Sequence, residues 1–267
     1  MPDIHAWKSR WIDELSGMMD EAEAEANFRF YSQWLSDQQL EFAEDSFGKI
    51  LERLINHEPI QYILGEAWFY GKPFYVDSHT LIPRPETEEL CDLILKQFPD
   101  LPMSIVDVGT GSGCIPVTLL QYKPNWQATA IDIDSGALAV AKINAEKHGV
   151  SNRLELIQHD FLAAIPALST NLIVSNPPYI HSSEAAAMDH NVLAFEPHAA
   201  LFPDSSDVLI FYRQLAAFLD MQSTNCALWA EINPRYAGET LELFHQYRKH
   251  QLHMDMSGKW RFIEVVK

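Results

Sequence analysis

Short apolar strands alternate with helices between residues 104 and 232 of this chain. The predicted strands cover residues 105–108, 128–133, 154–158, 172–175 and 227–232, and the predicted helices cover residues 114–122, 136–148 and 208–219. Parallel strands need long crossover connections, which helices usually supply. The alternation therefore predicts an α/β fold, in which helices cover both faces of a mostly parallel sheet.

Four residues that can serve a ligand stand at the ends of these predicted strands: Gly109, Asp132, Asp160 and Asn176. The carboxyl ends of parallel strands meet at one edge of the sheet, and ligands of open α/β sheets bind outside that edge. We therefore expect all four residues to line one pocket.

The first 64 residues follow a helical period instead. Three apolar stripes recur at helical spacing: Trp7, Trp11 and Leu15; Phe28, Tyr31, Trp34 and Leu35; and Phe47, Ile50, Leu51, Leu54 and Ile55. They predict a small helical bundle with these side chains in its core. The third helix should end near His57, because Pro59 disfavours helical backbone at the residue before it.

A hairpin is predicted between these two parts. Residues 68–70 and 74–76 form two short aromatic runs around a turn that contains Gly71, and this pattern is typical of a β-hairpin. Pro85 and the acidic residues that follow it predict the start of a helix. We therefore expect a helical domain (residues 1–64), a hairpin linker (residues 65–80) and an α/β domain (residues 81–267).

The charge of the chain limits its partners. Lys and Arg number 19 and Asp and Glu number 37, so the formal net charge is −18. Phosphate backbones repel such a protein at long range. We therefore expect no stable complex with nucleic acid through net charge alone, and the alternative is a local basic patch.

Cysteine usage and hydropathy point to the cytoplasm. Cys91, Cys114 and Cys226 are widely spaced and odd in number, which favours reduced thiols over a disulfide framework. The first 15 residues carry charges where a signal peptide is apolar, and no apolar run reaches the roughly 18 residues of a membrane span. We expect a cytoplasmic protein without a membrane partner.

The turn after the first strand is rich in glycine and indicates a nucleoside cofactor. Its pattern is G-x-G-x-G, not the G-x-G-x-x-G of dinucleotide enzymes. S-adenosylmethionine has cationic groups and no phosphates, so carboxylates suit it, and Asp132 is placed to accept from ribose hydroxyls. The predicted cofactor-binding residues here are Asp107, Gly109, Thr110, Gly111, Ser112, Gly113, Asp132 and Ile133.

The third strand end offers an adenine site. Asp160 is placed to bond the amino group of the base, and Phe161 to stack on its ring. An equally good interpretation makes Phe161 an ordinary core aromatic, so both interpretations stay open.

The fourth strand runs into Asn176, Pro177, Pro178 and Tyr179. Prolines end the ladder, since they have no N–H to donate. The Asn176 side-chain carbonyl and the Pro177 backbone carbonyl can accept the two N–H groups of a planar amide or aryl amine, and Tyr179 can stack on its flat face. Acceptors held this rigidly would favour the pyramidal nitrogen that attacks a methyl group. The bland alternative is a strand-terminating turn.

Other polar residues have weaker signals. Glu196 is either a base or a residue that orients the pocket, and we favour the second, because no base is needed before methyl transfer. Arg84 and Glu86 either pair at a helix start or touch substrate, and Glu88 could cap the pocket. His181, His190 and His198 are spaced too loosely for a metal motif, and no metal site is predicted.

The motifs together resemble a known family. "DVGTGSGC" and "NPPY" resemble class I S-adenosylmethionine-dependent methyltransferases that act on planar nitrogens. Adding "PIQYILG", "FYGKPFYV", "LIPRPETEEL" and "FEPHAAL" makes the set similar to the HemK/PrmC family of release factor glutamine methyltransferases. The resemblance runs from Pro59 nearly to the C-terminus. The predicted helices before Pro59 resemble the family only in being a helical domain, without a shared motif.

The resemblance implies a Rossmann-like, mostly parallel seven-stranded sheet behind an N-terminal helical bundle. It implies methylation of the glutamine amide nitrogen in the Gly-Gly-Gln motif of class 1 peptide chain release factors, with S-adenosylhomocysteine as product. By resemblance, Asn176 and Pro177 bind the glutamine amide and Tyr179 packs on it, with Pro178 and Glu196 beside them. The glycine turn, Phe161 and Asn176 would line the cofactor, and the bundle would dock the release factor.

Two departures from the family pattern lie beside this site. Residues 203–206 read Pro-Asp-Ser-Ser where glycines are usual, and Asn233 stands where the family usually has glycine. They bear on loop geometry more than on chemistry.

Three rival functions make different demands on the chain. A methyltransferase for exocyclic amines of DNA adenine or ribosomal RNA guanine would use the same Asn-Pro-Pro-Tyr chemistry on a flipped base, but it calls for a basic face. A non-catalytic binding module predicts an eroded cofactor turn or a lost Asn176. A nicotinamide oxidoreductase predicts the longer glycine spacing.

Overall fold

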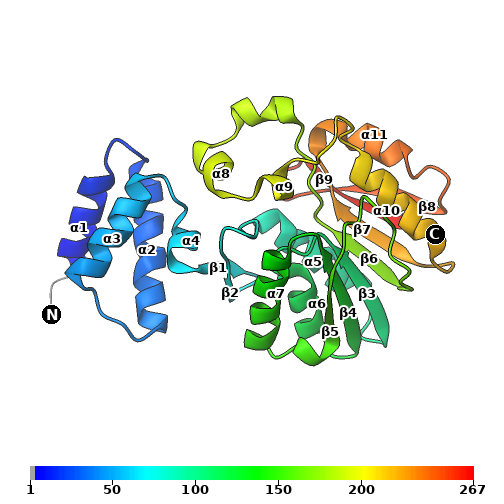
Figure 1. Cartoon of the computed structure of the whole chain (residues 1–267), viewed down its shortest axis with the longest axis horizontal. Coiled ribbons are helices and arrows are strands. Elements are labelled where there is room, and N and C mark those ends of the chain that lie inside the picture. The colour runs from blue at the N-terminus through cyan, green and yellow to red at the C-terminus, as the bar shows by residue number, and fades with distance from the viewer. Residues whose placement is uncertain (1–3) are drawn as a thin grey trace. The chain divides into compact units, whose positions relative to one another are not determined.

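The computed structural model describes residues 4–267, which form two compact units (Figure 1). The first unit contains residues up to 66 together with 189–195, and the second contains residues 67–188 and 196–267. Residues 1–3, which belong to the predicted helical domain, lie outside the described residues. Segment 189–195 was not foreseen as part of the first unit, and the predicted boundaries of the hairpin linker stay a prediction.

The first unit is helical. Its helices are α1 (Ile4–Leu15), α2 (Glu21–Asp37), α3 (Glu44–Ile55), α4 (Ile60–Leu64) and α8 (His190–Phe195). The predicted stripes of α1, α2 and α3 are confirmed as its core, although Ile55 is 39% exposed and Trp34 only partly buried. Helix α3 ends close to His57 as predicted, whereas the five residues of α4 were too few to show a helical period.

Aromatic packing holds this unit together. Trp11 is fully buried and stacks on Tyr31 with 5.5 Å between ring centroids. Its indole Nε1 donates to the Ala24 carbonyl at 3.0 Å, so the one polar atom of this large side chain is satisfied. Phe28 and Phe47 complete the cluster around Trp11.

The second unit contains a short hairpin and a seven-stranded sheet. The hairpin strands are β1 (Glu66–Phe69) and β2 (Lys72–Tyr75). The sheet strands are β3 (Met103–Val108), β4 (Trp126–Asp132), β5 (Leu154–Gln158), β6 (Leu172–Ser175), β7 (Ala227–Glu231), β8 (Lys249–Met254) and β9 (Trp260–Val266). Their order across the sheet is β5-β4-β3-β6-β7-β9-β8. Strand β9 is antiparallel to both of its neighbours, β7 and β8, and the other pairs of neighbouring strands are parallel.

Helices connect these strands. They are α5 (Pro85–Gln97), α6 (Cys114–Tyr122), α7 (Ser135–Lys147), α9 (His198–Leu201), α10 (Ile210–Met221) and α11 (Ala237–Glu242), with 3-10 turns at η1 (Ser151–Arg153), η2 (Ser182–Ala187) and η3 (Pro234–Tyr236). The predicted α/β fold is therefore confirmed. Strands β8 and β9 had no counterpart in the strands predicted residue by residue.

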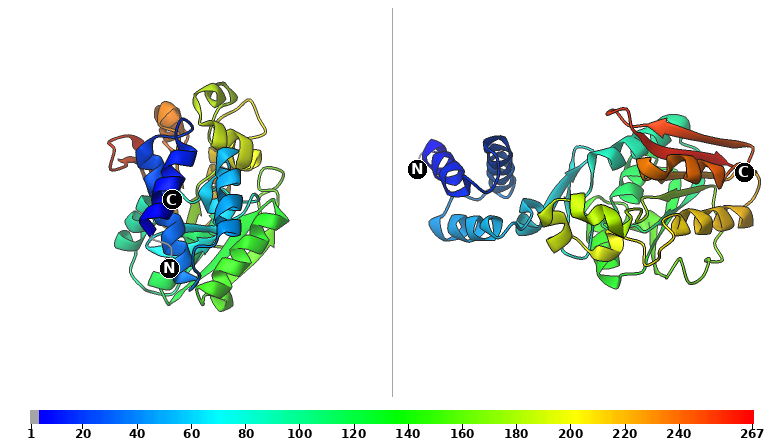
Figure 2. Two further views of the ribbon diagram at one scale, coloured as in Figure 1. Left: turned by 90° about the vertical axis from the view of Figure 1, so that its left-hand side faces the viewer. Right: turned by 90° about the horizontal axis from the view of Figure 1, so that it is seen from above.

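Helices cover both faces of the sheet (Figures 1 and 2). Successive residues of a strand point to opposite faces. Ile105 of β3 accordingly packs in the cluster formed with α5, α6 and α7, whereas its neighbour Val106 packs with α10 and α11. This burial on both sides explains why the central strands read as continuous apolar runs.

The three cysteines are buried and unpaired, as the cysteine count predicts. None of the helices within residues 4–267 combines the length and the apolar character that crossing a membrane requires.

Candidate active site

The candidate site lies where the strand order reverses. In β3, Val108 pairs with Ile131 of β4 on one side and with Ser175 of β6 on the other. The chain leaves β3 toward β4 and returns to the opposite side at β6, so the carboxyl ends of β3 and β6 form a topological switch point. The structure thus brings the glycine turn, Asp132 and Asn176 to one edge of the sheet, as predicted from the strand ends.

Backbone conformation explains the three glycines of the turn. Gly109, Gly111 and Gly113 have φ values of +74°, +52° and +75°, a region that other residues rarely adopt. A Cβ atom on Gly113 would also lie 3.0 Å from the Ala141 side chain. The turn is further fixed by Asn144 of α7, whose amide donates to the Ser112 carbonyl at 2.8 Å.

Asp132 ends β4, and its carboxylate binds the backbone of the glycine turn. Its Oδ2 accepts the Gly111 N–H at 2.9 Å, and its Oδ1 accepts the Asp134 N–H at 3.0 Å. Burial raises the pKa of this carboxyl, and these backbone donors oppose the rise. Each carboxylate oxygen has a second lone pair, so Asp132 can also accept from the hydroxyls of a ribose.

We expect Asp132→Ala to weaken cofactor binding by about 1–3 kcal/mol, the cost of leaving hydrogen-bond donors unpaired. Isothermal titration of the variant with S-adenosylmethionine measures this change. The control is Glu155→Ala, which removes an exposed carboxylate from the neighbouring strand β5. Unchanged affinity in Asp132→Ala would place the ribose elsewhere.

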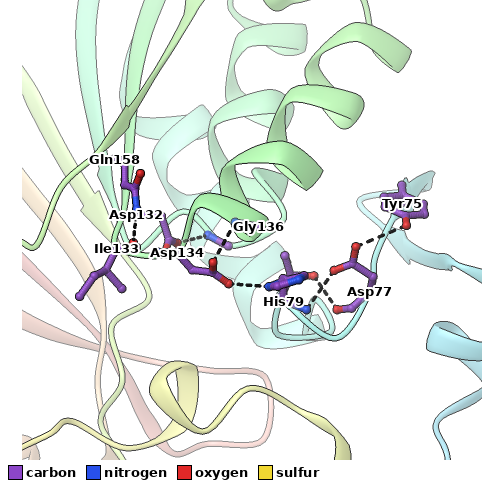
Figure 3. Close-up of polar contacts among 10 residues, drawn as sticks. Tyr75, Asp77, His79, Asp132, Ile133, Asp134, Gly136 and Gln158 are labelled. Carbon is purple, nitrogen blue, oxygen red and sulfur yellow. Dashed lines mark hydrogen bonds and ion pairs between the residues drawn. The ribbon is translucent and has the colours of Figure 1, made fainter.

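His79, which follows the hairpin, contacts the turn between β4 and α7 (Figure 3). His79 Nδ1 lies 2.8 Å from Asp134 Oδ2, and the other oxygen of Asp134 accepts the Gly136 N–H at the start of α7. The hydrogen bond to Asp134 raises the pKa of His79. A Cβ atom on Gly136 would come within 2.3 Å of the His79 ring, so a glycine is required for this approach. His79 was not predicted from the sequence.

Asp107 is the least satisfied group of the site. It is fully buried near the end of β3, and neither carboxylate oxygen has a hydrogen-bond partner. Burial raises its pKa to about 7, the nearby Thr110 hydroxyl holds it lower than burial alone would, and the Asp132 charge adds to the rise. A buried carboxylate without a partner is costly unless a cation or a donor approaches it. Asp107 therefore fits the ammonium group of S-adenosylmethionine.

The predicted adenine residues differ in their surroundings. Asp160 follows β5, and its Oδ1 accepts the N–H groups of Leu162 and Ala163. Phe161 is buried against Phe218, with ring centroids 5.8 Å apart, which supports the interpretation as a core aromatic. Ile133 is 56% exposed, and an exposed apolar side chain beside Asp132 suits contact with a base.

Asn176 follows β6, and its amide has a defined partner. Its Nδ2 donates to Thr87 Oγ1 at 3.1 Å, and the Thr87 hydroxyl in turn donates to Glu231 Oε1. Thr87 lies in the first turn of α5 and Glu231 ends β7. With Nδ2 used in this way, the side-chain carbonyl Oδ1 is left for a ligand.

The residues after Asn176 are partly enclosed. The peptide bonds into Pro177 and Pro178 are trans, as is every peptide bond within residues 4–267. Pro177 is buried, and the Tyr179 side chain packs against the α10 side of the core. Burial raises the pKa of the Tyr179 phenol, and the nearby Glu231 raises it further. The phenol is therefore un-ionised at neutral pH.

Asn233 stands where the family pattern has glycine, and its side chain ties down the Asn-Pro-Pro-Tyr loop. Its Nδ2 donates to the Tyr179 carbonyl at 3.1 Å and to Glu184 Oε1 at 3.0 Å. Its Oδ1 accepts the Arg235 N–H at 3.0 Å. This departure therefore adds contacts to the loop.

We expect Asn233→Ala to lower the free energy of unfolding by about 1–3 kcal/mol, because buried groups lose their partners. Urea unfolding measures this loss. The control is Asn152→Ala at an exposed position of η1, for which a change below about 0.5 kcal/mol is expected. Equal stability of the two variants would mean that the Asn233 contacts contribute nothing.

Glu196 is held by residues on its own chain. One oxygen accepts from Arg84 Nη2 at 2.5 Å and the other accepts the Ile82 N–H at 3.2 Å. The Glu196 side chain is almost fully buried. Arg84 thus pairs with Glu196, not with Glu86. The arrangement supports an orienting role for Glu196.

Like His79, Thr87 and Glu231 are site residues that the sequence did not reveal. Threonine in the first turn of a helix and glutamate at the end of an apolar strand are ordinary by themselves. Their partners lie 89 and 144 residues away along the chain, so no local motif joins them. The one sequence signal that could have indicated Glu231 is its position as a charged residue at the end of the apolar run of residues 227–231.

Metal ligands are not gathered at this edge. Within residues 4–267, no group of three or more His, Cys, Asp or Glu side chains is arranged to hold a metal ion. His181 accepts from the Ser183 N–H to cap η2, and the His198 ring packs on Phe202. His190 belongs to the helical unit, where its ring meets His57.

The chain is similar to known methyltransferases. Residues 86–219 match the family model of the methyltransferase small domain. A release factor glutamine methyltransferase of Flavobacterium psychrophilum is 36% identical and covers 98% of each chain. Its namesakes from Enterococcus faecalis and Bacteroides thetaiotaomicron are 36% and 40% identical, over 86% and 80% of this chain and 84% and 78% of their own.

A solved structure supports the fold independently. A putative rRNA methylase from Clostridium thermocellum aligns with a TM-score of 0.50 at 15% identity, over 70% of this chain and 100% of its own. At this identity the likeness concerns the fold alone.

Proposed function

The chain belongs to the HemK/PrmC family of release factor glutamine methyltransferases, and we propose that it methylates the glutamine of the Gly-Gly-Gln motif in class 1 peptide chain release factors. The reaction moves a methyl group from S-adenosylmethionine to the side-chain amide nitrogen. One observation carries the proposal: Asn176, with its amide oriented by Thr87, stands at the switch point beside a left-handed glycine turn.

The residues of the turn suit S-adenosylmethionine. The cofactor, when bound, supplies an electrophilic methyl group on a sulfonium sulfur. Asp107 would hold the ammonium group, and Asp132 would accept from the ribose hydroxyls. The glycine turn lets the backbone approach closely, and Asp160 and Ile133 would meet the base. S-adenosylhomocysteine, which has lost the sulfonium charge, would leave as product.

The chain's own acceptors would prepare the substrate nitrogen. An amide nitrogen is a poor nucleophile, because its lone pair is delocalised into the carbonyl. Asn176 Oδ1 and the Pro177 carbonyl would each accept one N–H of the glutamine amide. Both acceptors are in place before substrate arrives, which is how preorganised electrostatics lowers a barrier. Tyr179, with Pro178 beside it, would cover the flat face of the amide.

No base is needed before the transfer step in this scheme. The amide nitrogen loses a proton to solvent water after it gains the methyl group, when it is cationic and strongly acidic. Glu196 is already engaged by Arg84 and the Ile82 N–H. It would therefore orient the loop without accepting that proton.

The protein partner accounts for the remaining features. A release factor is a substrate that does not require binding of nucleic acid, which agrees with a net charge of −18. The helical unit would dock the body of the release factor, and translation termination would place the enzyme in the cytoplasm.

A methyl-transfer assay with radiolabelled S-adenosylmethionine tests the proposal. The substrates are a purified class 1 release factor, its Gln→Ala variant in the Gly-Gly-Gln motif, bulk DNA and bulk RNA. We expect label on the wild-type release factor alone. Label on nucleic acid would favour the exocyclic-amine methyltransferase, and label on the Gln→Ala variant would place the modified residue elsewhere.

A further inference from the structure

Asn176 needs more than its own position to work, because an amide has two ends of similar shape. Turned by 180° about its last bond, the side chain would present Nδ2, a donor, where the substrate N–H groups need an acceptor. Something in the protein must therefore select one orientation.

We propose that Thr87 and Glu231 form a buried relay that fixes the Asn176 amide with its carbonyl toward the substrate. Both are positioning residues, since they act through Asn176. This inference rests on the proposed function, which makes Asn176 Oδ1 an acceptor for the glutamine amide.

The relay is continuous, and its Thr87–Glu231 half is buried. Asn176 Nδ2 lies 3.1 Å from Thr87 Oγ1, and the Thr87 hydroxyl is hydrogen-bonded to Glu231 Oε1. The exposed fractions of Thr87 and Glu231 are 2% and 1%. Glu231 is held in place from α10, where the Tyr212 hydroxyl donates to its backbone carbonyl at 2.9 Å. Water therefore does not compete for the contact between Thr87 and Glu231.

The direction of the hydrogen bonds follows from chemistry. An ionised carboxylate only accepts, so the Thr87 hydroxyl must donate to Glu231. The single hydrogen of Thr87 is then used, and its oxygen can only accept from Asn176. Nδ2 is the donor end of that amide, so Oδ1 must face away from Thr87. One carboxylate thus sets the polarity of the whole relay.

The polarity depends on the ionisation of Glu231. Burial raises the pKa of Glu231 to about 7, and the hydrogen bond from Thr87 and the charge of Arg261 hold it lower than burial alone would. A protonated Glu231 can donate to Thr87, which frees the Thr87 hydrogen for Asn176 Oδ1. The wrong amide orientation then becomes available. The ionisable groups that act on Glu231 are Glu86 and Cys91 of α5, Cys114 of α6, Tyr179, Tyr212 of α10 and Arg261 of β9.

Thr87→Val is the sharpest test, because valine keeps the shape of threonine and removes the hydroxyl. We expect kcat for the release factor to fall roughly 10-fold to 100-fold, the range known for partners that orient metal-ligating side chains, which act in the same indirect way. The affinity for S-adenosylmethionine, measured by isothermal titration, should stay unchanged. The matched variant Thr87→Ser keeps the hydroxyl and should keep a kcat close to that of the wild type.

The pH profile supplies a readout that a packing role would not change. With the wild type at saturating cofactor and release factor, kcat should fall as the pH drops through about 7. Residue 231 cannot titrate in Glu231→Gln, so the acidic limb that Glu231 produces should be absent from its profile. Thermal unfolding of Thr87→Val shows whether that variant folds. If it does not fold, the pH profiles of the wild type and of Glu231→Gln still test the relay.

The outcomes separate the two proposals. If the wild type labels no release factor, the proposed function fails. If the wild type is active and Asn176→Ala is not, but Thr87→Val matches the wild type, only the relay is overturned. Equal losses in Thr87→Val and Thr87→Ser, or an unchanged acidic limb in Glu231→Gln, would also overturn it.

Discussion

Asn176→Ala is expected to lower kcat by roughly 100-fold to 1,000-fold, the cost of removing one preorganised acceptor from a transition state. The loss should fall on turnover because the Asn176 carbonyl acts on the substrate nitrogen, whose N–H groups become better donors as positive charge builds up there. Cofactor affinity should change little, since Asp107, Asp132 and the glycine turn remain. Steady-state assays with a release factor and isothermal titration with S-adenosylmethionine measure the two effects.

Asn152→Ala is the control for this substitution, because it removes a similar side chain from an exposed 3-10 turn. Its kcat should equal that of the wild type. Turnover retained in Asn176→Ala would remove Asn176 from the catalytic site and would leave the Pro177 carbonyl as the acceptor to test.

Asp107→Asn should separate cofactor binding from stability. Truncating one partner of a buried charge pair costs about 2–5 kcal/mol, so affinity for S-adenosylmethionine should fall by at least roughly 30-fold. The free protein should become more stable at neutral pH, because the variant buries a neutral amide in place of an unpartnered carboxylate. Titration calorimetry and thermal unfolding without cofactor measure the opposite effects.

The stability gain should depend on pH in a defined direction. The pKa of Asp107 is raised from 3.8 to about 7 in the folded protein. A raised carboxyl pKa means that the folded state binds the proton more tightly, so its contribution to stability is full below pH 4 and is lost as the pH rises through about 7. As the pH rises from 3.8 to about 7, Asp107→Asn should therefore become increasingly more stable than the wild type, and the difference should stay constant at higher pH.

The shift in Tm is measurable, since 1 kcal/mol changes Tm by ~2–4 °C in a chain of this size. Asp13→Asn, at an exposed position of α1, serves as the control and should follow the wild type at every pH. A constant difference between Asp107→Asn and the wild type from pH 4 to pH 8 would mean that Asp107 keeps its ordinary pKa.

Most of the fold follows from local patterns. The strands that became β3, β4, β5, β6 and β7 are short apolar runs followed by glycine, aspartate or asparagine, and such runs belong to a sheet covered on both faces. Strands β8 and β9 were harder to recognise. Polar residues such as His250 and Gln251 interrupt β8, which lies at the edge of the sheet and is only partly buried.

The candidate site divides in the same way. Gly109, Asp132 and Asn176 could be predicted because each follows a strand, and strand ends meet whatever the rest of the fold does. Thr87 and Glu231 could not, because their meeting depends on how α5 packs beside β7. The Glu196 partner of Arg84 could not be predicted for the same reason: Glu86, which was considered as a partner, is close in sequence, but Glu196 is close in space.

The helical unit is built from two separate segments of the chain, and this has a consequence for protein engineering. Residues 189–195 belong to that unit although they follow the Asn-Pro-Pro-Tyr loop, and the His190 ring packs edge-on against His57. A shortened protein that begins at residue 67 would keep this segment and lose the helices on which it packs. The helical unit is therefore not a detachable cassette, and grafting it onto another methyltransferase requires the transfer of two separate pieces of chain.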